Sequence, residues 1–196
     1  IKMASAGPVI FPARRTGKNG KVFAMFKLRT MHVAADGASA ITAPGDSRVF
    51  AFGNLIRKLK IDELTQFWNV LRGEMSIVGP RAEAPVVVET HYTAWMRETL
   101  EVAPGLTSPG ALYSYAMSDV LLDPDDPEGS YVDRMLRPKL ALERAYVDSG
   151  GFGHDLRYIG LTIVAIVAQI FGRHVRLPAS DISRARKWAP DGPYPD

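Results

Sequence analysis

An Asn-Gly dipeptide, Asn19-Gly20, does most to constrain the fold class of this chain of 196 residues. Asn-Gly is the strongest short-range signal for a hairpin turn, because both residues accept a positive φ. The flanking residues, within 8–31, are rich in β-branched and aromatic side chains, which favour strands. We therefore expect a small antiparallel hairpin close to the N-terminus.

The later part of the chain has helical patterns. Apolar periodicity and Pro-Gly breaks predict helices over these approximate ranges: 50–59, 62–71, 85–102, 130–148 and 154–173. Small polar residues predict a loop over 32–47, and the segment 107–115 indicates a turn followed by irregular structure. The predicted fold is α+β, a mostly helical single domain over 1–176 with a small N-terminal β-hairpin, followed by a flexible tail over 177–196.

Composition sets further limits on the class of protein. With 46% hydrophobic and 23% charged residues, the chain can bury one substantial core. It has no cysteine, which excludes disulfides and thiolate ligands and fits a reducing compartment. No run of the sequence reaches the roughly 18 apolar residues of a membrane-spanning helix.

Positive charge is concentrated in the first third of the chain. Eleven cations precede residue 62, and only Asp36 and Asp46 oppose them. A basic region of this kind indicates an anionic partner, such as phosphate groups, a membrane surface or nucleic acid. A solvated basic face without a partner is the alternative.

Two adjacent acids, Asp62 and Glu63, begin the predicted 62–71 helix directly after Arg57, Lys58 and Lys60. Asp62 suits a helix N-cap, and acids in the first turn complement the helix dipole. The same residues could instead form a diphosphate site, because a carboxylate can attack phosphorus while its neighbour holds Mg²⁺. Spacing alone leaves both interpretations open.

The same helix has an apolar stripe. Leu64, Phe67, Trp68 and Leu71 recur at i, i+3, i+4 and i+7, which is the period of an amphipathic helix. We expect the stripe, including Phe67 and Trp68, to face the core. Gly73 then suits the left-handed position that ends a helix.

The stretch from Gly53 to Arg81, GNLIRKLKIDELTQFWNVLRGEMSIVGPR, strongly resembles the signature of the bacterial sugar transferases. These are monotopic, membrane-associated phosphoglycosyl transferases that begin exopolysaccharide, O-antigen and glycoprotein glycan assembly. The resemblance extends to residues 7–31 and 139–167. It implies transfer of a phosphosugar from a UDP-sugar to a polyprenyl phosphate, namely undecaprenyl phosphate, with release of UMP.

The resemblance also implies roles for the acid pair. Asp62 matches the family's nucleophile, which carries the phosphosugar as a covalent intermediate, and Glu63 matches its partner. Both carboxylates would hold the expected cofactor, Mg²⁺.

Four cations match family positions that would bind the substrate phosphates. Lys27 and Arg29 fall on a Lys-x-Arg motif, Arg57 lies five residues before the expected nucleophile, and Arg81 belongs to a Gly-Pro-Arg corner. Their shared task would be to counter the charge of two phosphates and orient them for in-line attack.

The family further implies a membrane surface as partner, at the cytoplasmic face of the bacterial inner membrane, and no nucleic acid. Whether the chain forms a homodimer is left open by the sequence. Family members generally carry a hydrophobic N-terminal segment that enters the membrane, and this chain begins at about the position where that segment would end.

Departures from the family pattern leave some properties open. The segment 104–115 differs most, so the sugar is not identified, and Glu143 replaces a frequent aspartate. One alternative is an inactive or scaffold member of the family. Another is a basic, non-enzymatic module that binds anionic membrane or nucleic acid, whose affinity would fall steeply with salt and ignore Asp62→Asn.

Overall fold

A computed structural model describes residues 1–33, 41–42 and 45–195, and the chain is mostly helical over that part. In chain order the helices are α1 (Ala51–Lys58), η2 (Ile61–Gln66), α2 (Phe67–Leu71), α3 (Pro85–His91), α4 (Ala94–Arg97), η3 (Glu98–Glu101), α5 (Pro109–Leu121), α6 (Pro127–Ser130), η4 (Tyr131–Leu136), α7 (Arg137–Ser149), α8 (Phe152–Ile170) and α9 (Ala179–Ala185). Within the described ranges, none of these helices is long and apolar enough to cross a bilayer.

The predicted hairpin is confirmed. Strand β1 (Ile10–Thr16) pairs antiparallel with β2 (Val22–Leu28), and the 3₁₀ turn η1 (Lys18–Gly20) joins them. Asn19 has a φ of 57° and Gly20 a φ of 76°. Both values lie in the left-handed region that Asn and Gly tolerate best, which explains why the turn forms there.

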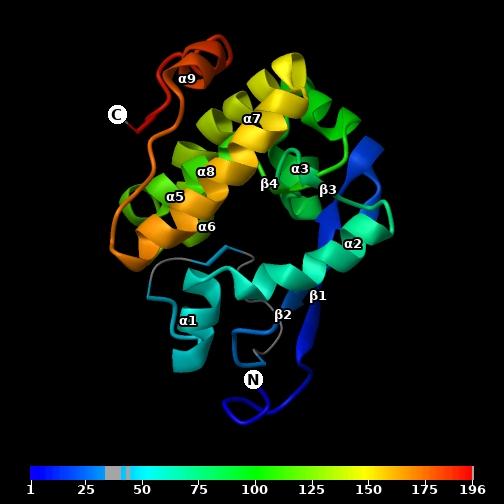
Figure 1. Ribbon diagram of the computed structural model, residues 1–196, viewed down its shortest axis with the longest axis vertical. Helices are drawn as coiled ribbons and strands as arrows, with labels where there is room; N and C mark the ends of the chain where they lie inside the picture. The colour runs from blue at the N-terminus through cyan, green and yellow to red at the C-terminus, as the bar shows by residue number, and fades with distance from the viewer. Residues whose placement is uncertain (34–40, 43–44, 196) are drawn as a thin grey trace.

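The main core lies among the later helices. Figure 1 shows α5, α7 and α8 packed together, with α1, α2 and the hairpin on another side of them. The largest side chains buried in this core include Tyr113 of α5, Leu140 and Leu142 of α7, and Tyr158 of α8. The hairpin covers a second, smaller core. The fold is α+β, as predicted.

A second pair of strands was not predicted. Strand β3 (Ser76–Val78) runs parallel to β4 (Gly105–Thr107). Each strand has three residues, too few to show a period of two in the sequence.

The expected orientation of the 62–71 helix is wrong. Leu64, Phe67, Trp68 and Leu71 are 56%, 46%, 58% and 79% exposed, so the apolar stripe faces outward. The polar side of η2 and α2 packs inward instead, against β2. The periodicity was correctly located, but it does not say which side of an amphipathic helix meets protein.

Two other predicted segments are wrong in detail. The helix expected over 85–102 is broken after His91, because Tyr92 and Thr93 adopt extended backbone. The irregular segment expected at 107–115 instead runs from the last residue of β4 into the first half of α5. Ser108 caps that helix by accepting the Ala111 N–H at 2.9 Å, and a proline follows at the first helical position, where it is favoured.

The final segment is folded against the core rather than forming a flexible tail. Leu177, Ala185 and Ala189 are buried, and Trp188 stacks on Trp95 with ring centroids 5.5 Å apart. The apolar residues of this segment are the physical reason, since together they bury enough surface to offset the cost of ordering. The loop expected at 32–47 lies largely outside the described residues.

Candidate active site

The short β3–β4 pair fixes the Gly-Pro-Arg corner. The Gly79 N–H donates to Thr107 O at 3.0 Å, and the Gly105 N–H donates to Pro80 O at 3.0 Å. A side chain at either glycine would collide with backbone of the opposite segment. The two glycines therefore let the chain segments meet closely enough to hold Arg81 in one place.

The acid pair is buried at the start of η2. Asp62 and Glu63 are 7% and 8% exposed, a degree of burial that is rare for acidic side chains. The chain enters η2 through Lys60, whose φ of 55° is left-handed. That turn is what lets the chain change direction between α1 and the acids.

Hydrogen bonds attach η2 and α2 to strand β2. The Thr65 hydroxyl donates to Phe26 O at 2.9 Å, and the Asn69 amide donates to Ala24 O at 2.8 Å. Asn69 also accepts the Phe26 N–H at 3.0 Å. These bonds hold the buried side of the helix against the strand that carries Lys27.

Glu63 and Arg81 form a two-pronged ion pair. Arg81 Nη1 lies 2.9 Å from Glu63 Oε2, and Nη2 lies 2.5 Å from Oε1. Lys27 Nζ lies 3.7 Å from the same Oε1. Burial alone would raise the pKa of Glu63, but the charges of Arg81 and Lys27 hold it far below its ordinary value. Glu63 is therefore a fixed negative charge.

Asp62 has a different environment. Its Oδ1 is buried and has no hydrogen-bond partner among the described residues. Burial first, and then the neighbouring Glu63 charge, raise the pKa of Asp62, while Lys27 and other cations oppose the rise. The N-cap position is taken by Lys60, so the capping interpretation of Asp62 does not hold. An unpartnered carboxylate oxygen among cations is suited to attack on phosphorus or to binding a cation.

The other predicted cations are placed differently from one another. Burial lowers the pKa of Lys27 to about 8, although Glu63 acts in the opposite direction. Arg57 donates to the Thr30 hydroxyl at 3.3 Å, on the approach to η2. Arg29 is not brought to the acid pair: its guanidinium donates to the backbone oxygens of Pro8, Ser5 and Met31 and to the Ser5 hydroxyl.

Glu143 of α7 supports the corner from behind. It accepts the Arg81 backbone N–H at 3.0 Å and the Ser108 hydroxyl at 2.6 Å through Oε1. Gly110 is required beside it, because a side chain there would collide with the Glu143 carboxylate. Burial raises the pKa of Glu143 to about 7. The carboxyl group of Glu143 thus joins α7 to the backbone of Arg81 and to Ser108 at the start of α5.

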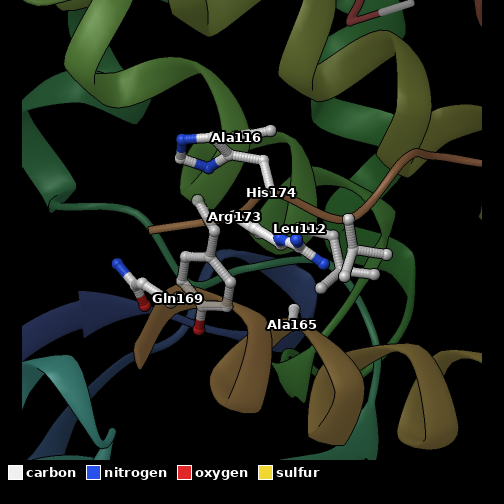
Figure 2. Close-up of a pocket in the computed structure, with 8 residues that line it drawn as sticks. Leu112, Ala116, Ala165, Gln169, Arg173 and His174 are labelled. Atoms are coloured by element: carbon white, nitrogen blue, oxygen red, sulfur yellow. The ribbon is translucent and has the colours of Figure 1, made fainter. Parts of the chain in front are cut away.

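A small cavity lies between α5, α8 and the segment that follows α8 (Figure 2). Its lining includes Tyr115, whose ring lies 3.9 Å from Lys60 Nζ, together with Gln169, Arg173 and His174. The volume of about 10 Å³ is room for a single water. A substrate the size of a nucleotide sugar does not fit inside this cavity.

The acid pair fits a magnesium ion. Among the described residues, no three His, Cys, Asp or Glu side chains gather as a metal site. Mg²⁺ needs only one or two carboxylates, because water and substrate phosphates complete its shell. Asp62 Oδ1 is unpartnered, and each Glu63 oxygen keeps a lone pair beyond its bond from Arg81.

Sequence reasoning missed several residues around the site. Glu143 was noted only as a substitution, and Lys60 only as a cation, although the first holds the Arg81 corner and the second makes the left-handed turn. Gln66 and Asn69 were not singled out. Their signal was readable, because Asp62, Gln66 and Asn69 recur at i, i+4 and i+7 as a polar stripe.

Comparison with known proteins decides the family. The family model for bacterial sugar transferases matches residues 1–169. The chain belongs to the bacterial sugar transferase family. The UDP-glucose:undecaprenyl-phosphate glucose-1-phosphate transferase of Xanthomonas campestris pv. campestris is 34% identical over 174 residues, which cover 86% of this chain and 34% of that protein.

Other members of the bacterial sugar transferase family give the same picture. The UDP-glucose:undecaprenyl-phosphate glucose-1-phosphate transferase of Caulobacter vibrioides is 33% identical over 171 residues, covering 85% of this chain and 60% of that protein. The exopolysaccharide production protein PSS of Rhizobium leguminosarum bv. phaseoli is 32% identical over 178 residues, covering 84% of this chain and 80% of that protein. The chain therefore spans between a third and four fifths of the length of these three relatives.

Proposed function

We propose that this chain transfers a phosphosugar from a UDP-sugar to undecaprenyl phosphate and releases UMP. The observation that carries the proposal is the buried Asp62, whose Oδ1 has no partner among the described residues, beside a Glu63 fixed by Arg81 and Lys27. The names of the relatives, which specify UDP-glucose and undecaprenyl phosphate for two of them, support the same reaction class.

The reaction proceeds in two displacements. A carboxylate oxygen of Asp62 attacks the phosphorus that carries the sugar. A new O–P bond forms, the bond from that phosphorus to the bridging oxygen breaks, and the bridging oxygen leaves on UMP. An oxygen of the lipid phosphate then attacks the same phosphorus and releases the Asp62 carboxylate. The lipid diphosphate sugar is the product. Each step is a single displacement at phosphorus, which is the advantage of a covalent intermediate.

Cations around Asp62 stabilise the charge that moves in these steps. Lys27 and Arg57 both favour the ionised form of Asp62, which is the attacking form. Arg81 orients Glu63 and has a further donor bond to Leu106 O at 3.2 Å. Preorganised cations of this kind stabilise a phosphoryl-transfer transition state without reorganising during the reaction. Asp62 and Glu63 would hold Mg²⁺, which supplies charge neutralisation when bound.

Arg29 has a different part in this proposal from the one expected. All of its described hydrogen bonds go to residues 5, 8 and 31, so it ties the N-terminal segment to the end of β2. The proposed phosphate ligands are therefore Lys27, Arg57 and Arg81.

A membrane surface is the proposed platform. The outward stripe of Leu64, Phe67, Trp68 and Leu71, which we call the apolar face, lies on the same helix turns as the acid pair. Insertion of such side chains into the headgroup boundary would bring a lipid phosphate to Asp62. Since nucleotide sugars are cytoplasmic compounds, we place the reaction at the cytoplasmic face of the inner membrane, in agreement with the absence of cysteine.

Release of UMP tests the proposal. The protein is incubated with a panel of UDP-sugars, Mg²⁺ and undecaprenyl phosphate in vesicles, and UMP is quantified by chromatography. We expect release with at least one sugar, and its loss in Asp62→Asn. Asp133→Asn, which removes an exposed acid of η4, is the matched control and should keep full activity. Equal rates for Asp62→Asn and the wild type would overturn the proposal.

A further inference from the structure

Gln66, the last residue of η2, has an unusual environment. Its side chain is fully buried, at 0% exposure, yet neither its Nε2 nor its Oε1 has a hydrogen-bond partner among the described residues. A buried amide of this kind is costly, because it gives up its bonds to water and gains none in return. Native proteins keep such groups rarely, and a catalytic role, a bound ion or a buried water is the usual reason.

Asn69, three residues further along the same helical segment, gives a direct contrast. Asn69 is equally buried, at 0% exposure, but its amide bonds to Ala24, Phe26 and Glu74. The two side chains carry the same amide group and are equally buried, but only the Asn69 amide is hydrogen-bonded to protein groups. A structural role therefore accounts for Asn69 and does not account for Gln66.

The position of Gln66 in the sequence is close to the reacting acid. It follows Asp62 by four residues on η2, the element that packs against β2, and both side chains are buried. Thr65 and Asn69, on either side of Gln66 in the sequence, are bonded to β2 backbone. These anchors fix the helix at Gln66, and neither of them satisfies its amide.

We propose that Gln66 is a substrate-binding residue whose Nε2 donates a hydrogen bond to an oxygen of the phosphosugar that Asp62 attacks. Its Oε1 is then available to a hydroxyl hydrogen of the same sugar. An amide suits this place, because it adds a donor beside the phosphate without adding charge next to Asp62 and Glu63. This inference rests on the proposed transferase function and names a further contact in the same site.

Two replacements of Gln66 test the inference through stability and activity together. Gln66→Leu and Gln66→Met keep the approximate volume and remove the amide. We expect melting temperatures equal to or above that of the wild type, since an unpaired buried polar group has been removed. We expect UMP release to fall roughly 10-fold or more, as for a lost substrate hydrogen bond.

Asn69→Leu is the matched control for stability. It removes an amide of equal burial that is bonded, so its melting temperature should fall by several degrees. If both Gln66 variants lose stability as Asn69→Leu does, Gln66 is structural and the inference is overturned. Unchanged UMP release by both variants in the presence of an active wild type would overturn it as well.

Failure of the underlying function gives a different pattern. A wild type that releases no UMP with any sugar in lipid vesicles would contradict the proposed function, and the Gln66 contact would fall with it. An active wild type with stable but slow Gln66 variants is the result that supports both.

Discussion

The ion pair between Arg81 and Glu63 is held by geometry more than by charge. Taking two charges out of water costs several kcal/mol for each ion, and the pair offsets this only when both prongs are aligned. The planar guanidinium matches both carboxylate oxygens, which a lysine ammonium cannot do. At this site the positive charge alone is therefore insufficient.

Arg81→Lys tests that distinction. The variant keeps the charge but loses the two-pronged contact, so Glu63 is no longer fixed beside Asp62. We expect UMP release to fall by about 10²-fold, the usual cost of removing one preorganised electrostatic contact. Steady-state kinetics would check this, with Arg14→Lys on the exposed side of β1 as the matched control. Full activity of Arg81→Lys would show that its shape is unimportant.

Glu143 makes a prediction about pH. Its pKa is raised to about 7 in the folded chain, against an ordinary value of 4.5. Its contribution to stability is therefore complete below pH 4.5 and is lost as pH rises to about 7, because the unfolded chain ionises first. The loss amounts to about 3 kcal/mol at most.

Glu143→Gln has no such titration. We expect its free energy of unfolding, measured by urea denaturation, to gain on that of the wild type between pH 4.5 and 7. The difference in unfolding free energy between the two proteins reports the titration of Glu143 alone, because both proteins contain all the other acids of the chain. Parallel pH profiles for the two proteins would contradict the assignment of a raised pKa to Glu143.

At the scale of single elements, η2 and α2 form a helix whose polar side faces protein. The buried side contributes Asp62, Glu63, Gln66 and Asn69, and the outward side carries the apolar face. A contiguous apolar surface on a folded domain marks an interaction site. A helix with buried acids on one side and an apolar face on the other therefore suits a boundary between protein, water and lipid.

Trp68→Ser combined with Leu71→Ser tests the apolar face. Both side chains are largely exposed, so the melting temperature should change little. Binding to vesicles that contain anionic lipid, measured by co-sedimentation, should weaken by at least about 10-fold, since each large apolar group contributes about 1.5–3 kcal/mol when buried. Phe152→Ser is the control, because Phe152 is 79% exposed at the end of α8 remote from α1. Equal weakening by both changes would remove any special role for α2.

The accuracy of sequence reasoning differed between elements for identifiable reasons. The hairpin and α1 could be predicted, because their signals are local. The outward direction of Trp68 could not, since a period of 3.6 locates two faces without saying which one meets solvent or lipid. The β3–β4 pair joins segments about 30 residues apart, and neither segment has a local signal.

The candidate site shows the same division. Lys27 and Arg81 are brought to Glu63. The phosphate-binding role that the resemblance implied for them stays a prediction. Arg29 is two residues beyond Lys27 but lies past the end of β2, so the alternation that would have put both side chains on one face no longer applies. Gln66 and Glu143 depend on tertiary contacts that only the fold supplies.

At the scale of the whole molecule, the C-terminal segment completes the main core. Tyr158 of α8 donates to Asp181 of α9 at 2.6 Å, and Trp188 stacks on Trp95. The family match ends at residue 169, so each of these contacts joins the matched part of the chain to the segment that follows it. Figure 1 shows this segment returning along the helices to end beside α9.

Two tryptophan replacements test whether this segment is structural. Trp188→Ala should lower the free energy of unfolding by about 2–3 kcal/mol, which corresponds to about 5–10 °C in melting temperature. Trp68→Ala removes the same side chain from an exposed position and should change the free energy by less than about 0.5 kcal/mol. Thermal denaturation followed by circular dichroism would measure both. Equal melting temperatures for the two variants would instead favour the original prediction of a flexible tail over 177–196.

The site itself lies where the parts of the molecule meet. Lys27 comes from the hairpin, Asp62 and Glu63 from η2, Arg81 from the corner after β3, and Glu143 from α7 behind it. A chain that did not bring these elements together would leave each charge alone and solvated. In the proposed function, this assembly makes Asp62 the nucleophile.

The most direct test is the intact mass of the purified protein after brief exposure to UDP-sugars and Mg²⁺ without lipid acceptor. We expect a mass increase equal to one phosphosugar in the wild type, located at Asp62 by peptide mapping, and none in Asp62→Asn. Addition of undecaprenyl phosphate should remove the adduct. UMP release without any adduct, or an adduct that persists in Asp62→Asn, would rule out a covalent intermediate on Asp62.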